Sequence, residues 1–305
     1  MLIYASSPLS VSISGEWVSI LGEPQISLAI SKYVEIWVKE SLRSTIEFQI
    51  NSIAESTNYT TKLLRLIESM LMDYYDVRNL SFTINIPLDL RYGLGCISAL
   101  CTALLASTSK IYNISINEDS IIKHSKELEE KLFGYGSSIS SILALTGGIV
   151  AYREEEGYIT VKYKGDYNIV IGASDKAFVD VLRICKQYSR KIAPLQSLIK
   201  HSIGHATIEI ADCFRRGNVK KLYEALNASY MLQSSLFKIP PRINRIISSC
   251  RILGAYAATL SGINKQYVVC LTYKGNDRLE KFLSKKGFHI LPVSISKRGL
   301  VTYEC

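Results

Sequence analysis

The chain has 305 residues, of which 48% are hydrophobic and 21% are charged, and this globular composition excludes an intrinsically disordered protein. Its formal net charge is +9, but the basic residues are spread along expected helices, so a solvated helix surface explains them better than a nucleic-acid interface. The seven cysteines include no Cys-x-x-Cys pair, and no apolar stretch is long enough to span a membrane.

The first half of the chain alternates between strand and helix patterns. Residues 1–53 carry β-branched and aromatic residues between turn breaks, which predicts several strands. A helix is expected from Thr60 to about Asp76, a strand before Pro87, a helix through about Ser107, and another helix that begins with Ser115 and Glu118 as a capping box. Because the N-terminus resembles a strand rather than a signal peptide, we expect a cytoplasmic protein.

The second half of the chain predicts an α+β arrangement. A short helix at 139–145 ends at Gly147 and Gly148, and three strands follow it. Helices are then expected at about 176–189, 195–216, 219–236 and 242–253, followed by the strand "QYVVCLTY", a helix and the strand "HILPVSI". His201 and His205 share one face of the second of these helices, where a structural or surface role is expected.

The stretch "RYGLGCISAL" places Gly93 and Gly95 around Leu94, directly before a helix. Such a turn can aim backbone N–H groups at a phosphate, and the positive end of the helix dipole favours an anion there. Glycines also serve tight turns and helix packing, so this signal alone is weak.

Three further segments, read in order with this turn, resemble the GHMP kinase superfamily, and its archaeal mevalonate kinases in particular. "SPLSVSISGEWVSILGEPQISLAI" resembles the first family motif, in which Ala-Pro-Gly-Lys leads to Gly-Glu-His, and "GLGCISA" resembles the second, Gly-Leu-Gly-Ser-Ser-Ala. "FGYGSSISSILALTGGIVAY" is similar to the Pro-Ser-Gly-Ile-Asp segment, and "RILGAYAATLSG" is similar to the third motif.

The resemblance implies an α+β, two-domain GHMP kinase fold. Residues 1–165 would form an N-terminal α/β nucleotide-binding domain with mostly antiparallel strands, and residues 166–305 a C-terminal ferredoxin-like domain. It also implies the cofactors ATP and Mg²⁺. Nucleotide contacts would come from Gly93, Leu94, Gly95, Cys96 and Ser98.

The metal-binding glutamate of the family aligns with Glu129, although Glu127 and Glu130 are close enough to take that role. A solvated acidic helix face explains the same "KELEEK" stretch equally well. Substrate contacts would come from four residues, namely Glu16, Lys176, Ser261 and Gly262. Lys176 is also explained as a solvated residue in the first turn of a helix.

Each family motif is altered at its functional positions. The catalytic Asp and Lys of the family align with Ser140 and Ser10, and neither serine can act as a carboxylate base or a positive charge at neutral pH. Cys96 and Ile97 replace the hydroxyl residues of the glycine turn. In the third motif "INKQ", which includes Ile263 and Lys265, replaces a glycine run.

The resemblance favours an ATP-dependent kinase that phosphorylates a hydroxyl of mevalonate or a related isoprenoid precursor. The alternatives are a non-catalytic homologue that binds a ligand or partner, and a relative with a changed substrate, such as a phosphomevalonate kinase, a mevalonate 3-kinase or a decarboxylase. A small molecule is the expected partner, nucleic acid and membrane are not, and a homodimer is left open.

Overall fold

The computed structural model describes residues 1–43, 45–52, 58–87, 93–165, 167–263, 266–272 and 276–305. Their contacts define two compact units, and each unit is discontinuous in sequence. Unit 1 contains Met1–Ser10, Ala29–Gly147 and Ser296–Cys305, and unit 2 contains Val11–Leu28 and Gly148–Ile295. The boundary predicted at 165 lies inside unit 2, so the contact units do not follow the predicted order of domains along the chain.

Two long strands, β1 (Leu2–Ser14) and β2 (Gln25–Glu40), contribute residues to both units. In unit 1 the strand order is β11 (Val301–Glu304), β1, β2, β4 (Leu80–Ile86), β3 (Glu47–Ser52). The β1–β11 and β2–β4 pairs are antiparallel, and β3 pairs with β4 in parallel. Along β4 buried and half-buried residues alternate strictly, which is the pattern of a strand with one face against the core.

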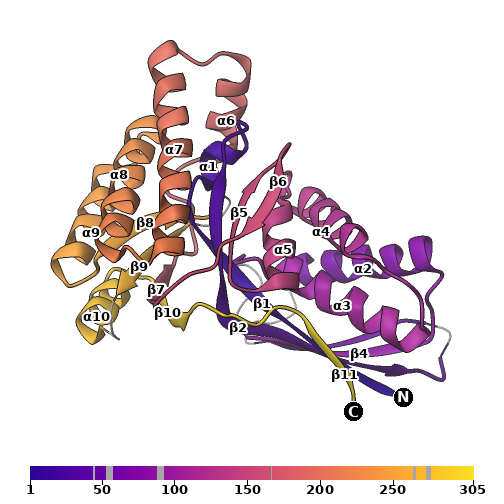
Figure 1. Cartoon of the computed structure of the whole chain (residues 1–305). Coiled ribbons are helices and arrows are strands. Elements are labelled where there is room, and N and C mark those ends of the chain that lie inside the picture. Colours follow the sequence, from indigo (N-terminus) through magenta and orange to yellow (C-terminus); the bar gives the residue numbers. More distant parts are fainter. Residues whose placement is uncertain (44, 53–57, 88–92, 166, 264–265, 273–275) are drawn as a thin grey trace. The chain divides into compact units, whose positions relative to one another are not determined.

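The helices of unit 1 lie on one face of these strands (Figure 1). They are α2 (Asn58–Tyr75), α3 (Cys96–Tyr112), α4 (Glu118–Phe133) and α5 (Ser138–Thr146). Every residue of α3 from Cys96 to Leu105 is buried, and its many small side chains let α4 and α5 pack closely against it. The predicted capping box at Ser115 and Glu118 is wrong, because the Asn117 side chain caps α4 by accepting a hydrogen bond from the Ser120 N–H at 2.8 Å.

Unit 2 contains a four-stranded antiparallel sheet in the order β10, β7, β9, β8. These strands are β7 (Asn168–Ala173), β8 (Ala257–Ser261), β9 (Tyr267–Thr272) and β10 (His289–Ser294). The order 4-1-3-2, with helices after the first and third strands, is the ferredoxin-like arrangement that the family resemblance implied. The mostly antiparallel strand pairing that the resemblance implied is therefore present.

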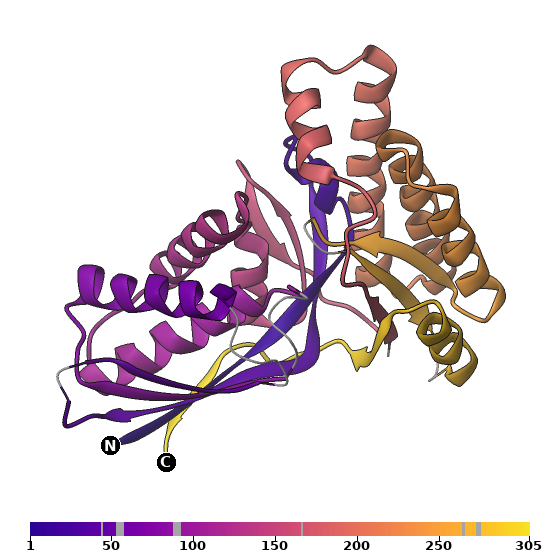
Figure 2. The same ribbon diagram turned by 180° about the vertical axis from the view of Figure 1, so that it is seen from behind.

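The longer helices of unit 2 are seen from the opposite side in Figure 2. They are α6 (Val181–Arg190), α7 (Pro194–Arg216), α8 (Val219–Phe237), α9 (Pro241–Ile252) and α10 (Asp277–Lys285). Unit 2 also contains α1 (Glu16–Ser19) and the hairpin of β5 (Ile149–Arg153) and β6 (Gly157–Thr160). Within the described ranges, no helix has both the length and the apolar character that crossing a bilayer requires.

Candidate nucleotide and metal site in unit 1

The glycine turn before α3 has three successive residues in the left-handed region. The φ angles are 78° at Gly93, 51° at Leu94 and 67° at Gly95, so two glycines relieve most of the strain of this path. The turn is fixed by two backbone hydrogen bonds, from the Cys96 N–H to the Gly93 carbonyl at 2.9 Å and from the Ser10 N–H on β1 to the Leu94 carbonyl at 2.9 Å. Arg91 and Tyr92, which precede the turn in the quoted stretch, lie outside the described residues.

Helix α3 begins directly after this turn without a side-chain cap. The first amides of an α-helix have no acceptor within the helix itself, and the helix dipole places partial positive charge at that end. The Cys96 and Ile97 side chains are buried, at 0% and 2% exposure, whereas Gly93 and Gly95 are half-buried. The two substitutions therefore place apolar side chains in the core and leave the glycine backbone on the accessible side of the turn.

Glu129 on α4 lies beside the start of α3. Its Oε1 accepts a hydrogen bond from the Ser98 hydroxyl at 2.7 Å, and its Oε2 accepts one from the Ser137 N–H at 3.1 Å. Gly136 brings the segment before α5 against α4 so closely that a Cβ there would overlap the Lys126 carbonyl oxygen. Packing of α3, α4 and α5 thus places one carboxylate and one hydroxyl at the helix end that follows the glycine turn.

The two other glutamates proposed for the metal do not share this position. Glu127 faces His124, with 3.4 Å between Oε2 and Nδ1, and Glu130 is exposed. Only Glu129, among these three, is paired with a residue of the glycine-turn helix. The structure therefore favours Glu129 among the three candidates.

The chemistry of Ser98 and Glu129 fits a magnesium ion held jointly with a nucleotide. Mg²⁺ prefers oxygen ligands and is commonly bound by one or two protein oxygens together with substrate phosphates. The described residues contain no group of three His, Cys, Asp or Glu side chains that would hold a metal without such phosphates. One carboxylate and one hydroxyl together are a donor set of the kind that Mg²⁺ shares with substrate phosphates.

Ser10 and Ser140, which replace the catalytic Lys and Asp of the family, both lie in unit 1. Ser10 is 4% exposed, and its Oγ packs against the Cα of Gly95 so closely that a Cβ there would overlap it. Ser140 is half-buried in the first turn of α5, three residues after Ser137, whose N–H binds Glu129. Ser10 is thus a direct neighbour of the glycine turn, and Ser140 follows the segment that binds Glu129.

Residues of the predicted substrate site in unit 2

Glu16, Ser261 and Gly262 are joined directly to one another. Glu16 Oε2 accepts hydrogen bonds from the Ser261 hydroxyl at 2.9 Å and the Gly262 N–H at 2.6 Å, and the Trp17 indole N–H donates to the Gly262 carbonyl at 3.0 Å. Gly262 has a φ of 90°, which suits glycine. The structure shows α1 holding the end of β8, and substrate contact by these residues stays a prediction.

Burial raises the pKa of the Glu16 carboxyl above its ordinary value, while the Gly262 N–H and the Ser261 hydroxyl lower it in part. Between the ordinary and the raised pKa the folded chain binds a proton that the unfolded chain has released. Stability therefore falls as pH rises through this window. Glu16→Gln removes this effect, so the free energy of unfolding of the variant relative to the wild type is expected to increase with pH.

Urea unfolding of both proteins at about pH 4 and about pH 7 measures this change. A difference in free energy between the two proteins that stays constant across these pH values contradicts it. Exposed Glu209→Gln on α7 serves as the control for a glutamate with ordinary surroundings.

Lys176 is exposed in the segment between β7 and α6. Helix α6 begins only at Val181, after Asp180, so the predicted helix start at 176 is wrong. The Asp180 side chain accepts a hydrogen bond from the Arg183 N–H and marks the true start. Ile263 packs against the core of unit 2, and Asn264 and Lys265 lie outside the described residues.

Sequence reasoning missed a buried charge cluster in unit 2. Glu23 is 5% exposed, and its Oε1 lies 2.7 Å from His201 Nδ1 and 3.2 Å from Lys200 Nζ. Gly204 makes room for this carboxylate, because a Cβ there would overlap Glu23 Oε2. Glu23 and its two partners on α7 are far apart in the chain, so the sequence carries no local signal for this cluster.

Comparisons with known proteins agree with the order of the motifs. Residues 210–263 match the family model described as GHMP kinases C terminal. The chain is 22% identical over 275 residues to the mevalonate kinase of Saccharolobus solfataricus, which covers 86% of this chain and 87% of that protein.

Two solved structures have the same fold. The L. major mevalonate kinase in complex with R-mevalonate has a TM-score of 0.82 at 19% identity and covers 96% of both chains. The Streptococcus pneumoniae phosphomevalonate kinase has a TM-score of 0.74 at 15% identity and covers 97% of this chain and 100% of that one. The resemblance that the motifs predicted is confirmed.

Proposed function

We propose that this chain, which has the GHMP kinase fold, is an ATP-dependent kinase that transfers a phosphoryl group to a hydroxyl of mevalonate or a related isoprenoid precursor. The observation that carries the proposal is the Ser98–Glu129 pair beside the uncapped start of α3, directly after the glycine turn. The names of the similar proteins, mevalonate kinase and phosphomevalonate kinase, support the substrate class.

In this proposal the backbone of Gly93 to Cys96 and the start of α3 bind the nucleotide phosphates. The Ser98 hydroxyl and the Glu129 carboxylate would hold Mg²⁺, which would supply positive charge to neutralise the phosphate oxygens. Ser140 donates or accepts a hydrogen bond at the acceptor hydroxyl and orients it. Because phosphoryl transfer relies mainly on positioning and charge stabilisation, a site without a carboxylate base keeps a slow reaction.

MgATP is expected to raise the melting temperature, since a ligand that binds only the folded state adds about 2.7 kcal/mol at one hundred times its Kd. Glu129→Gln keeps the shape of the side chain but removes its charge, so it is expected to weaken MgATP binding about tenfold or more. Glu130 is an exposed neighbour, and Glu130→Gln is the matched control, for which MgATP is expected to raise the melting temperature as in the wild type. If MgATP raises the melting temperature of both variants equally, Glu129 does not bind the metal.

The second candidate function is a non-catalytic homologue, and the specific observation that favours it is the pair of serines at positions 10 and 140. A sensitive assay with MgATP and a panel of mevalonate, phosphomevalonate and mevalonate diphosphate separates the candidates. Product from one of these acceptors supports the kinase. A thermal shift with MgATP but no product from any acceptor favours the non-catalytic homologue.

A further inference from the structure

An apolar pocket of unit 2 is built from residues that directly follow two of the predicted substrate contacts. Lys176 precedes the first lining residue in the chain, and Gly262 precedes the last. The pocket has a volume of about 240 Å³, and its lining comes from Ala177, Phe178, Val179, Asp180, Leu182 and Ile263. The sequence analysis gave a role to the two flanking residues and none to the pocket between them.

Gln266, directly before β9, fixes the segment that forms most of this lining. Its side chain is fully buried, and its Oε1 accepts hydrogen bonds from the Phe178 N–H and from the Val179 N–H, the second at 2.9 Å. Its Nε2 donates to the Val179 carbonyl at 2.8 Å. Breaking these bonds would leave buried polar groups unpaired, which is costly, so this part of the pocket is formed before any ligand binds.

The rest of the lining comes from the altered third motif. Ile263 lines the pocket and packs against the core of unit 2. Gly262 before it is held by Glu16 Oε2 and by the Trp17 indole N–H. The family resemblance places a run of glycines after Gly262, and glycine would leave no apolar side chain here. Ile263 and Gln266, both departures from the family motif, therefore help to build the pocket.

The charges around the pocket favour an anionic ligand. Asp180 is the acidic residue of the lining, and its carboxylate already accepts the Arg183 N–H at 3.1 Å and lies 3.4 Å from Arg183 Nε. Lys176 is exposed, and in the part of the chain that the structure describes its ammonium group has no acidic partner. An apolar pocket beside an unpaired cation suits an anion that carries a hydrocarbon group.

We propose that the pocket binds the hydrocarbon part of an amphipathic anion whose charged group pairs with Lys176, and that Ile263 determines this specificity. The inference rests on the proposed kinase function, in which this anion is the acceptor substrate. An apolar cavity of about 150 Å³ holds benzene, so this larger, open pocket has room for about six carbon atoms. Mevalonate has a single methyl branch, and the proposal therefore assigns the chain an acceptor with a larger hydrocarbon group.

The first test measures the binding of acetate, butyrate and hexanoate to the full chain without nucleotide, by ligand-observed NMR. Each added methylene is expected to tighten binding about fourfold, as its transfer to an apolar site does. Hexyl phosphate identifies whether the charged group is a carboxylate or a phosphate. Lys176→Gln is expected to weaken the binding of all these anions by up to about fivefold, the most that an exposed ion pair usually contributes. Equal binding of the three acids overturns the proposal.

The second test changes the lining. Ala177→Trp puts a large side chain at an exposed position of the pocket and is expected to abolish the dependence on chain length. Ile263→Ala removes apolar lining and is expected to weaken hexanoate more than acetate. The melting temperature of each variant without ligand shows whether it is folded. Folded variants that both keep the wild-type dependence on chain length overturn the proposal.

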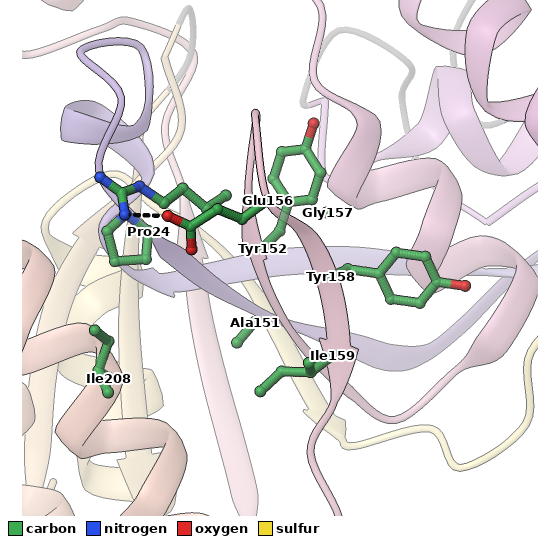
Figure 3. A pocket seen from close by; sticks show the side chains of 9 residues that line it. Pro24, Ala151, Tyr152, Glu156, Gly157, Tyr158, Ile159 and Ile208 are labelled. Atoms are coloured by element: carbon green, nitrogen blue, oxygen red, sulfur yellow. Dashed lines mark hydrogen bonds and ion pairs between the residues drawn. The ribbon is translucent and has the colours of Figure 1, made fainter.

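A separate apolar pocket of unit 2 provides the matched control. Figure 3 shows Pro24, Ala151 and Ile208 at this pocket, which has a volume of about 200 Å³. Ile208 is 60% exposed, so Ile208→Trp fills this pocket in the same way. Ile208→Trp is expected to bind the three acids as the wild type does. Loss of the dependence on chain length in Ile208→Trp places the acids in the control pocket and overturns the proposal.

The third test connects the pocket with the acceptor. Hexanoate at a concentration equal to its Kd is expected to raise the KM for the acceptor about twofold and to leave kcat and the KM for MgATP unchanged, because it occupies the place of the acceptor. A rise in the KM for MgATP instead contradicts the assignment of the pocket to the acceptor.

Failure of the kinase proposal and failure of the pocket proposal give different results. If hexanoate binds and Ala177→Trp abolishes the dependence on chain length while no acceptor gives product, the pocket is supported and the kinase function is wrong. If mevalonate gives product but the three acids bind equally, the kinase function is supported and the pocket proposal is wrong. Absence of hexanoate binding at about 50 mM also overturns the pocket proposal, since that Kd would correspond to less than half the binding free energy of a micromolar ligand.

Discussion

Replacing Ser140 with aspartate is expected to raise the rate of phosphoryl transfer about 100-fold to 10,000-fold, the usual contribution of a positioned general base. Ser140 lies in the first turn of α5, and the N-terminal end of a helix favours a negative charge. Ser140 is half-buried, whereas Ser10 is buried and packs directly against Gly95. The initial rate with MgATP and the accepted substrate measures the effect.

Ser140→Asn is the matched control, because it has the size of aspartate without the charge, and its rate is expected to stay near that of the wild type. Equal rates for the Asp and Asn variants would show that position 140 does not contact the acceptor hydroxyl. If neither variant nor the wild type forms product while MgATP still raises the melting temperature, the chain binds the nucleotide but the kinase proposal is wrong.

Gly95→Ala is expected to lower the free energy of unfolding by about 2 kcal/mol and to abolish stabilisation by MgATP. A left-handed residue that is not glycine costs about 1 kcal/mol, and the new methyl group would also overlap Ser10 Oγ. Denaturant unfolding with and without MgATP measures both effects.

Gly134→Ala provides the comparison for Gly95→Ala, since Gly134 has a φ of 75° at the end of α4 and no atom within 4 Å of an added Cβ. It is expected to show the conformational cost alone. Combining Gly95→Ala with Ser10→Ala removes the overlapping hydroxyl. The double variant is expected to recover the part of the unfolding free energy that Gly95→Ala loses beyond the loss in Gly134→Ala. Equal losses in the single variants at positions 95 and 134 would contradict close packing between Gly95 and Ser10.

The sequence predicted the longer helices well where apolar spacing and end signals agreed. Helix α7 was expected at 195–216 and spans Pro194–Arg216, with proline in its first turn and Gly217 as its left-handed cap. Short elements were missed, among them α1, β8 and β11, because four or five residues carry too little periodicity to distinguish them from loops. Helix α3 continues to Tyr112, five residues beyond the expected end at about Ser107.

The candidate site was predictable only through the order of the motifs. That order aligned Glu129 with the metal-binding glutamate and left Glu127 and Glu130 open. The hydrogen bond from Ser98 to Glu129 depends on how α3 packs against α4, which spacing along one helix does not reveal. The pairing of Glu23 with Lys200 and His201 joins residues far apart in the chain, so no local pattern predicts it. The same holds for the contact between Glu16 and Gly262.

Each unit is built from segments that are separated in the chain, so a continuous fragment of either half lacks part of its unit. A fragment of residues 1–165 would lack β11, which pairs with β1 from Ile3 to Ser6, and a fragment of residues 166–305 would lack Glu16 and Trp17, which hold Ser261 and Gly262. Unit 1 is completed only by Ser296–Cys305, which follow the whole of unit 2 in the chain. The closure of unit 1 therefore has to wait until unit 2 has been synthesised, and the first strand must stay available for β11 until then.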